Sequence, residues 1–187
     1  MKKLILTLLM IFVLPYNAFT YPNEPDGFRA MKWCESLEQL EKKGYSFVLS
    51  HYLPNKSPVY ELITTDKNVF GVEAIKIRCN FWNNQLNEVN IIFAEQSTDF
   101  RKKFNPLYKY AIENFGESTP ELTFIKPDSY FLYWKGEKTK IILYAYEKDE
   151  LSSKDTAYGD TALVLASEVL SKKIMAEVKA KKKNNKI

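Results

Sequence analysis

Apolar and polar residues alternate most clearly over residues 75–81, where Ile75, Ile77, Cys79 and Phe81 share the apolar side. A short turn follows, and residues 89–93 return with the same alternation. A period of two with one polar side is typical of antiparallel strands in a sheet that has one face in water. The sequence therefore predicts an antiparallel hairpin here.

The same alternation, interrupted by turn residues, predicts further strands. Residues 161–166 fit either a strand or the start of a continuous helix, and the pattern favours the strand. The other predicted strands cover residues 28–33, 45–51, 59–65, 122–125, 130–134 and 141–146.

Apolar residues at helical spacing predict three helices. Ser36 begins a capping-box pattern before a short first helix that ends at Gly44. The second helix occupies residues 100–115. Pro106 either kinks this helix or lies in the first turn of a shorter helix that Asn105 caps.

The order of these elements predicts an α+β fold with a mainly antiparallel sheet and two or three helices. The third helix, capped by Ser167, should end near Lys181. A helix followed by a hairpin occurs twice, which suggests an internal duplication of a helix-plus-meander unit. The residues expected at the sheet–helix interface are Ile77, Phe81, Val89, Ile91, Phe104 and Ile112.

Residues 1–20 predict a cleavable secretory signal. Two lysines precede an apolar run over residues 4–14, and small residues follow at Ala18 and Thr20. About eleven apolar residues are fewer than the roughly twenty that a spanning helix needs, so we favour cleavage after Ala18 or Thr20 over a retained anchor. The mature protein should then be periplasmic or secreted, in a Gram-negative bacterium, without a transmembrane segment.

The mature chain has the size of one domain. Residues 21–27 predict an extended leader, residues 28–180 a single α+β domain, and residues 181–187 a disordered Lys-rich tail. The formal net charge of +4 falls to +2 without the lysines of the signal, and residues 168–187 alone carry +5, which leaves −3 on the body. Because a nucleic-acid-binding protein has a basic folded face, we do not expect nucleic acid as a partner.

The chain has two cysteines, Cys34 and Cys79. In an oxidising compartment an even pair favours a disulfide. A bridge closing about 46 residues would stabilise the fold by roughly 4 kcal/mol. Two buried free thiols are the alternative, because export permits a bridge without requiring one. The spacing does not fit a redox CxxC motif, and a metal site needs more ligands.

No residue pattern predicts a cofactor, a metal or a complete catalytic motif. His51 is the only histidine, and a catalytic histidine needs a nucleophile and an orienting acid within reach. A hydrolase with an unrecognised site near His51 is therefore kept as the alternative function. The acid pairs Asp149–Glu150 and Asp155–Asp160 lie in a polar segment, where a solvated surface is expected.

Aromatic residues gather on the hairpin predicted over residues 130–146. Packing between the second helix on one face and the C-terminal helix on the other would account for them. The alternative is an exposed aromatic surface for a ligand or partner. The residues of this candidate surface are Tyr130, Tyr133, Trp134, Tyr144 and Tyr146.

The segment Gly27–Cys34 reads Gly-Phe-Arg-Ala-Met-Lys-Trp-Cys. It resembles the opening of a family of uncharacterised exported bacterial proteins, which begin with a Gly-Phe-Arg-Gly-Ile-Lys-Trp-Gly type motif followed by a short helix. The later strand pairs and the helix ending at Phe115 follow a similar plan. This chain departs from the motif at Ala30 and Cys34, where glycine is usual. The resemblance implies export and a fold plan, and it implies no activity.

These observations predict a monomeric, exported α+β domain that binds an envelope protein or a small ligand without catalysis. A cleft that gathers His51 with a serine and a carboxylate would instead favour a hydrolase. An exposed aromatic or apolar patch would favour the binding domain.

Overall fold

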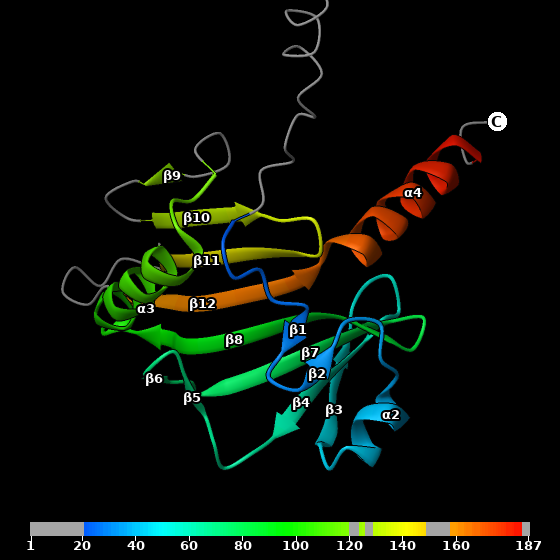
Figure 1. Cartoon of the computed structure of the whole chain (residues 1–187), viewed down its shortest axis with the longest axis horizontal. Coiled ribbons are helices and arrows are strands. Elements are labelled where there is room, and N and C mark those ends of the chain that lie inside the picture. The colour runs from blue at the N-terminus through cyan, green and yellow to red at the C-terminus, as the bar shows by residue number, and fades with distance from the viewer. Residues whose placement is uncertain (1–20, 120–123, 126–128, 149–157, 185–187) are drawn as a thin grey trace, which may run out of the picture.

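The computed structural model describes residues 21–119, 124–125, 129–148 and 158–184. The predicted signal at 1–20 and the acid pair at 149–150 lie outside the described residues, as does Asp155. The described chain is an α+β fold, as predicted, with one eight-stranded antiparallel sheet in the order β3-β4-β7-β8-β12-β11-β10-β9 (Figure 1).

Each element has the following bounds. The strands of the main sheet are β3 (Ser46–Tyr52), β4 (Pro58–Ile63), β7 (Lys76–Trp82), β8 (Gln85–Ser97), β9 (Phe124–Ile125), β10 (Ser129–Lys135), β11 (Thr139–Lys148) and β12 (Tyr158–Ser167). Two small hairpins pair β1 (Gly27–Phe28) with β2 (Met31–Lys32), and β5 (Asn68–Val69) with β6 (Val72–Glu73). The helices are α2 (Leu37–Lys42), α3 (Phe100–Phe115) and α4 (Glu168–Asn184).

The sheet is built from two similar halves that meet at the pair β8–β12. In the first half α2 is followed by β3, β4, β7 and β8, and in the second half α3 is followed by β9, β10, β11 and β12. The strand order of the second half reverses that of the first across the sheet. This arrangement agrees with the predicted repeat of a helix-plus-meander unit. The hairpin β5–β6 is an insertion in the first half.

Local sequence fixes several turns and helix ends. The Ser36 side chain accepts a hydrogen bond from the Gln39 backbone N–H, and the Gln39 side chain accepts one from the Ser36 N–H, so the predicted capping box caps α2. Gly44 follows α2 with a φ of 90°, the left-handed region that glycine enters without steric cost. The β7–β8 turn places Asn83 and Asn84 at φ 49° and 58°, as a two-residue hairpin turn requires.

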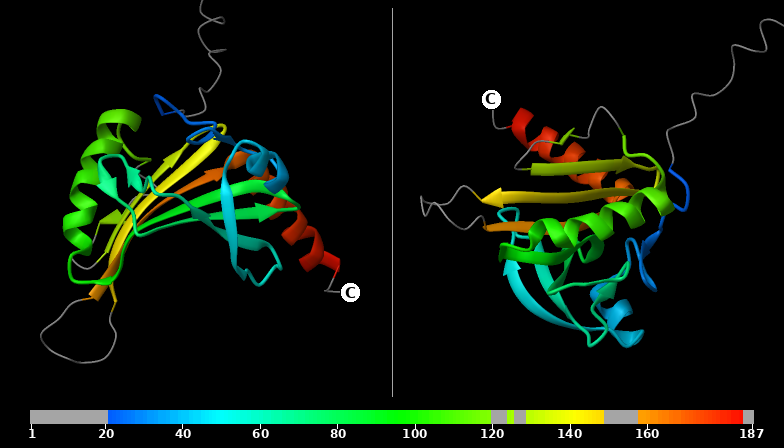
Figure 2. Two further views of the ribbon diagram at one scale, coloured as in Figure 1. Left: turned by 90° about the horizontal axis from the view of Figure 1, so that it is seen from below. Right: turned by 90° about the vertical axis from the view of Figure 1, so that its left-hand side faces the viewer.

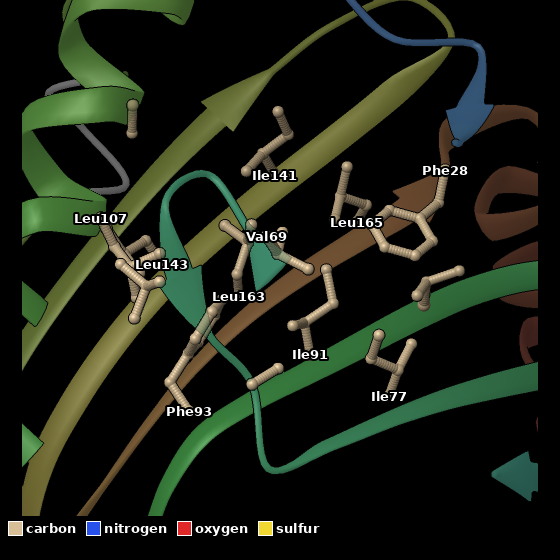
Figure 3. Close-up of a cluster of buried hydrophobic side chains, with 14 of the residues drawn as sticks. Phe28, Val69, Ile77, Ile91, Phe93, Leu107, Ile141, Leu143, Leu163 and Leu165 are labelled. Carbon is tan, nitrogen blue, oxygen red and sulfur yellow. The ribbon is translucent and has the colours of Figure 1, made fainter. Parts of the chain in front are cut away.

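The core lies on one face of the sheet, which is called the covered face here. Five adjacent strands each contribute one residue to a continuous apolar row, and each residue is at most 2% exposed. Figure 3 shows several of these side chains directed to the same side of the sheet. The row is Ile77, Ile91, Leu163, Leu143 and Leu132.

The elements outside the main sheet divide between its two sides. Figure 2 shows α3, the β5–β6 hairpin and the N-terminal segment over the covered face. In contrast, α4 leaves the end of β12 and points away from the sheet (Figure 1). The first turn of α4 is buried at Leu170, but Met175 and Val178 are exposed. The second face is therefore called the open face here.

The structure corrects four details of the prediction. The strand expected over 28–33 is the hairpin β1–β2, because the chain reverses at Arg29 with a φ of 57°. Pro106 lies inside one continuous α3, so Asn105 caps no separate helix. Residues 181–184 belong to α4. Ile112 is half-buried, because it lies beside the strip of α3 that faces the sheet.

The remaining interface residues behave as predicted, since Phe104 is 5% exposed and the other four are at most 1% exposed. Residues 161–166 belong to a strand, β12, as the pattern favoured. Thr161, the first of them, donates a buried hydrogen bond to the Phe100 carbonyl, which ties β12 to the start of α3.

Candidate functional site

A pocket of about 380 Å³ lies over the covered face, where three separate segments approach one another. This pocket is called the hairpin pocket here, because the tips of β1–β2 and β5–β6 form two of its walls. The C-terminal half of α3 forms the third wall. Its lining residues are Asn23, Pro25, Gly27, Phe28, Arg29, Asn68, Val69, Phe70, Tyr110, Asn114, Phe115 and Leu165.

The floor of the hairpin pocket is apolar. Phe28, Val69 and Leu165 come from β1, β5 and β12, and each is at most 6% exposed. Figure 3 shows the Phe28 ring beside Leu165, with Val69 above the sheet nearby. Phe115 of α3 completes the floor at 5% exposure. An apolar floor with a few polar groups around it is typical of small-molecule sites.

Two tight turns place side chains at the pocket mouth. The β1–β2 turn puts Arg29 at φ 57°, and the β5–β6 turn puts Phe70 and Gly71 at φ 56° and 78°. Gly71 suits this region, whereas a bulky residue such as Phe70 is uncommon there. The Asn68 side chain supports the second turn by accepting a hydrogen bond from the Gly71 N–H at 3.0 Å. In β1, position 27 must be a glycine, because a Cβ there would overlap the Met31 carbonyl oxygen.

Arg29 joins the two hairpins. One of its terminal nitrogens donates to the carbonyls of Asp66 and Asn68 at 2.8 and 3.3 Å, and lies 3.3 Å from the Asp66 carboxylate. The guanidinium also lies over the Phe28 ring, 5.2 Å from its centroid. The side chain is 24% exposed. Arg29 is the only charged residue in the lining of the pocket.

The helical wall carries an aromatic stack and an amide. Tyr110 stacks on Phe70 with ring centroids 4.0 Å apart and an interplanar angle of 12°. The Asn114 side chain donates to the Tyr110 carbonyl at 2.9 Å, and the Asn114 carbonyl accepts from the Asn23 side chain at 3.0 Å. These contacts hold the N-terminal segment, the hairpin tip and α3 against one another.

The N-terminal wall is anchored at Thr139, at the start of β11. The Tyr21 hydroxyl donates to the Thr139 carbonyl at 2.8 Å, and the Glu24 carboxylate accepts from the Thr139 N–H at 2.6 Å. The Thr139 hydroxyl donates to the Pro25 carbonyl and accepts from the Trp33 indole N–H at 2.6 Å. Burial, with the Glu24 charge as a second cause, raises the pKa of Tyr21. The segment expected as a leader is thus docked on the sheet.

The lining of the hairpin pocket is chemically simple. It consists of apolar side chains, three asparagines, one tyrosine and Arg29. It contains no serine, threonine, cysteine, histidine or carboxylate, the side chains that most often act as nucleophiles or general acid–base groups. The asparagine amides can both donate and accept hydrogen bonds.

A second pocket of similar volume lies between α4 and two loops of the sheet. Its wall combines Ile174 and Val178 of α4 with Trp82, but lysine, glutamate and asparagine side chains make up much of the remaining lining. It therefore lacks the apolar floor of the hairpin pocket.

The candidate aromatic residues divide between the two faces of the sheet. Trp134 is 1% exposed in the core, and its indole N–H donates to the Gly116 carbonyl at 2.9 Å. Tyr130 packs on Phe104 on the covered face, with ring centroids 4.9 Å apart. The other three, Tyr133, Tyr144 and Tyr146, alternate onto the open face and are half-buried.

The open face also carries polar side chains on adjacent positions of β7 and β8. Arg78 pairs with Asn90, and Asn80 pairs with Glu88. The Arg78 Nε and the side-chain oxygens of Asn80 and Asn90 are buried and lack a hydrogen-bond partner among the described residues. Burial also raises the pKa of Glu88, against the opposing effect of Lys140. These atoms are enclosed by their neighbours, so they do not form an accessible site as they stand.

Both cysteines are free thiols in the structure, so the predicted bridge is not formed. Cys34 is half-buried after the N-terminal hairpin, where its N–H donates to the Leu86 carbonyl at 3.1 Å. Cys79 lies within β7 opposite Val89 and is fully buried. The backbones of Cys34 and Cys79 are thus held by different hydrogen bonds. Burial raises the pKa of the Cys79 thiol to about 12.

His51 lies exposed on the edge strand β3. Its Nδ1 is 3.1 Å from the Ser50 hydroxyl, and within the described part of the chain no carboxylate bonds to it. A Ser–His pair needs an orienting acid and a cleft to act as a hydrolytic site. His51 lines neither of the two pockets, so the geometry does not support the hydrolase alternative.

Metal ligands and membrane-spanning helices bear on the kind of site. Across the described ranges, no group of three or more histidine, cysteine or acidic side chains is placed to hold a metal ion. None of the described helices combines the length and the apolar character needed to cross a membrane.

Comparison with known proteins adds no relative: no protein-family model, curated protein or solved structure matches this chain. The function must therefore be argued from the site itself.

Sequence reasoning did not single out most of the hairpin pocket. It marked Gly27–Arg29, which carries the family resemblance, but it did not mark Phe70, Tyr110 or Asn114. One signal was present, because glycine, here Gly71, is favoured in tight hairpin turns. The approach of this turn to α3 depends on tertiary packing, which one sequence does not reveal.

Proposed function

We propose that this chain is an exported, non-catalytic binding domain that holds a small ligand in the hairpin pocket. The observation that carries the proposal is the pocket itself, which has an apolar floor, a rim of amide groups and a single charge. Its volume of about 380 Å³ lies within the usual range for ligand sites. The absence of a nucleophile or carboxylate from its lining favours binding over catalysis.

Pre-organisation supports the same proposal. Arg29 links the two hairpins, the Phe70–Tyr110 stack links the second hairpin to α3, and Asn23 links the N-terminal segment to α3. A pocket held open by such contacts binds a ligand with a smaller ordering cost. Two uncommon backbone conformations, at Arg29 and Phe70, form the mouth, and strained residues of this kind cluster at functional sites.

Export is the second part of the proposal. Tyr21, the first residue after Thr20, is 8% exposed and donates to the Thr139 carbonyl, so a chain cleaved after Ala18 or Thr20 keeps this anchor of the N-terminal segment. Intact-mass measurement after expression in a Gram-negative host should show the loss of 18 to 20 residues. A full-length mass in the membrane fraction would contradict export.

A neutral fluorescent probe tests the pocket. N-phenyl-1-naphthylamine, which becomes emissive in apolar sites, should bind the purified mature protein saturably with one site per chain. Asn114→Trp should abolish this binding, because Asn114 is half-buried on the wall and an indole would fill the mouth. Glu113→Trp, one position away on the exposed side of α3, is the matched control and should bind like the unmodified protein.

Two results would contradict a pocket function. One is the absence of saturable binding by the unmodified protein. The other is equal binding by the Asn114→Trp and Glu113→Trp proteins, which would place the probe elsewhere on the molecule.

A further inference from the structure

We propose that the ligand of the hairpin pocket is an amphipathic carboxylate: an apolar body on the pocket floor with one carboxylate group that Arg29 binds. This inference rests on the proposed function and adds the ligand class. It is carried by the position and hydrogen bonding of Arg29, the one charged side chain in the lining.

The guanidinium has donors left for a ligand. An arginine has five N–H groups, and the two on one terminal nitrogen of Arg29 serve the carbonyls of Asp66 and Asn68. Among the described residues the other terminal nitrogen and Nε make no hydrogen bond. Three N–H groups in a fixed fork therefore remain, and this geometry matches the two oxygens of a carboxylate.

The anchoring of Arg29 favours binding of an anion. Contacts to Asp66, Asn68 and the Phe28 ring hold the side chain in place before any ligand arrives, so little rotamer entropy remains to be lost on binding. Asp66 is 69% exposed and does not line the pocket. Solvent therefore weakens its pairing with Arg29.

The count of charges favours a singly charged head. The lining contains one cation and no second basic residue. A phosphate monoester, which carries close to two charges at neutral pH, would leave one charge unpaired beside an apolar floor, at a considerable desolvation cost. A carboxylate carries one charge, which matches the single cation of the lining. The body of the ligand contacts Phe28, Val69 and Leu165, which offer no polar side-chain atom.

Three amphiphiles with the same eight-carbon body test the ligand class. Octanoate, octanol and octylammonium should be compared by displacement of bound N-phenyl-1-naphthylamine at pH 7.5 in low salt. Octanoate should displace the probe at about a tenfold lower concentration than octanol, which is the usual gain from a charge-assisted hydrogen bond. Octylammonium should be the weakest. Octanol is more apolar than octanoate, so this order cannot arise from the hydrophobic effect.

Substitution at Arg29 tests the residue. Arg29→Gln should reduce the octanoate preference over octanol to about onefold, and because this ratio compares two ligands on the same variant, it does not depend on how tightly that variant binds the probe. Arg29→Lys should keep part of the preference, because it keeps the charge but not the fork. Lys109→Gln removes an exposed cation next to Tyr110 that does not line the pocket, and it should leave the preference unchanged.

Each outcome separates the two proposals. If the probe does not bind the unmodified protein, the pocket function fails. If the probe binds and the three amphiphiles displace it equally, or octylammonium is preferred, only the carboxylate inference fails. If Arg29→Gln does not fold, the order of the three amphiphiles and the loss of the octanoate preference in 1 M salt decide the question on the unmodified protein.

Discussion

Thr139 offers the sharpest test of how the N-terminal segment is held on the sheet. The residue is fully buried, and its N–H, carbonyl and hydroxyl all bond to residues from the N-terminal segment. Thr139→Val keeps the shape and the backbone bonds but removes the hydroxyl. The Trp33 indole N–H and the Pro25 carbonyl then both lose their partner.

The cost of this substitution follows from the two groups left unpaired. Each buried polar group without a partner costs about 1–3 kcal/mol. Trp33 and Pro25 are both half-buried, so water can reach both groups partly and the lower half of the range applies. We expect Thr139→Val to lower the free energy of unfolding by about 2–4 kcal/mol. Thr139→Ser keeps the hydroxyl and loses one methyl group, which should cost about 1 kcal/mol.

Urea denaturation monitored by tryptophan fluorescence measures both variants. The valine variant should be the less stable of the two, although valine is the more apolar residue. If Thr139→Val changes stability by less than about 0.5 kcal/mol, or if Thr139→Ser is the more damaging change, the hydroxyl does not hold the segment. Because this segment is a wall of the hairpin pocket, the valine variant should also bind the fluorescent probe more weakly.

Three further predictions follow from burial. A thiol reagent at pH 8 should label Cys34 in the native protein but reach Cys79 only after denaturation, because burial raises the pKa of Cys79 to about 12. If fewer than two thiols per chain react after denaturation, the cysteines are bonded and the free-thiol assignment is wrong. Phe104→Ala should lower the free energy of unfolding by about 3–5 kcal/mol in urea titrations. A loss below about 1 kcal/mol would mean that Phe104 is not on the side of α3 that faces the sheet. Glu88→Gln should raise the melting temperature at pH 7, because burial raises the pKa of Glu88 in the native state. The ionised Glu88 carboxylate does not destabilise the fold below the pKa that Glu88 has in the unfolded chain, and it destabilises the fold fully above the higher pKa that Glu88 has in the folded state. The increase in melting temperature should therefore vanish in acid, and equal increases at pH 3 and pH 7 would contradict this prediction.

The strands that sequence predicted best are those with one buried and one wet side. Over residues 76–82 the exposure alternates at every position, as the apolar pattern indicated. The capping box at Ser36 and the turn at Asn83–Asn84 are equally local, because each depends on residues within three or four positions. Such features are encoded where they occur, and one sequence suffices to find them.

Features that depend on distant partners were not predicted. The chain reverses at Arg29, and the guanidinium finds its partners at Asp66 and Asn68, more than thirty residues away. The leader looked extended because its own sequence lacks periodicity, yet Thr139 anchors it from the far half of the fold. The pairing expected for Cys34 failed for the same reason, since the Leu86 carbonyl fixes its backbone.

The placement of the hairpin pocket argues that it serves a function. The repeated unit of one helix and four strands accounts for the main sheet and for α2 and α3. Three parts of the described chain stand outside this repeat: the N-terminal segment with β1–β2, the β5–β6 hairpin and α4. The first two are the parts that close the pocket over β12 and α3. Both also carry uncommon backbone conformations, at Arg29 and Phe70, which the sheet itself does not require. These two segments also cover the apolar face of the sheet, but that packing does not explain the strain at their tips. The strain is best explained by what the tips build together, which is a site with an apolar floor and one anchored guanidinium.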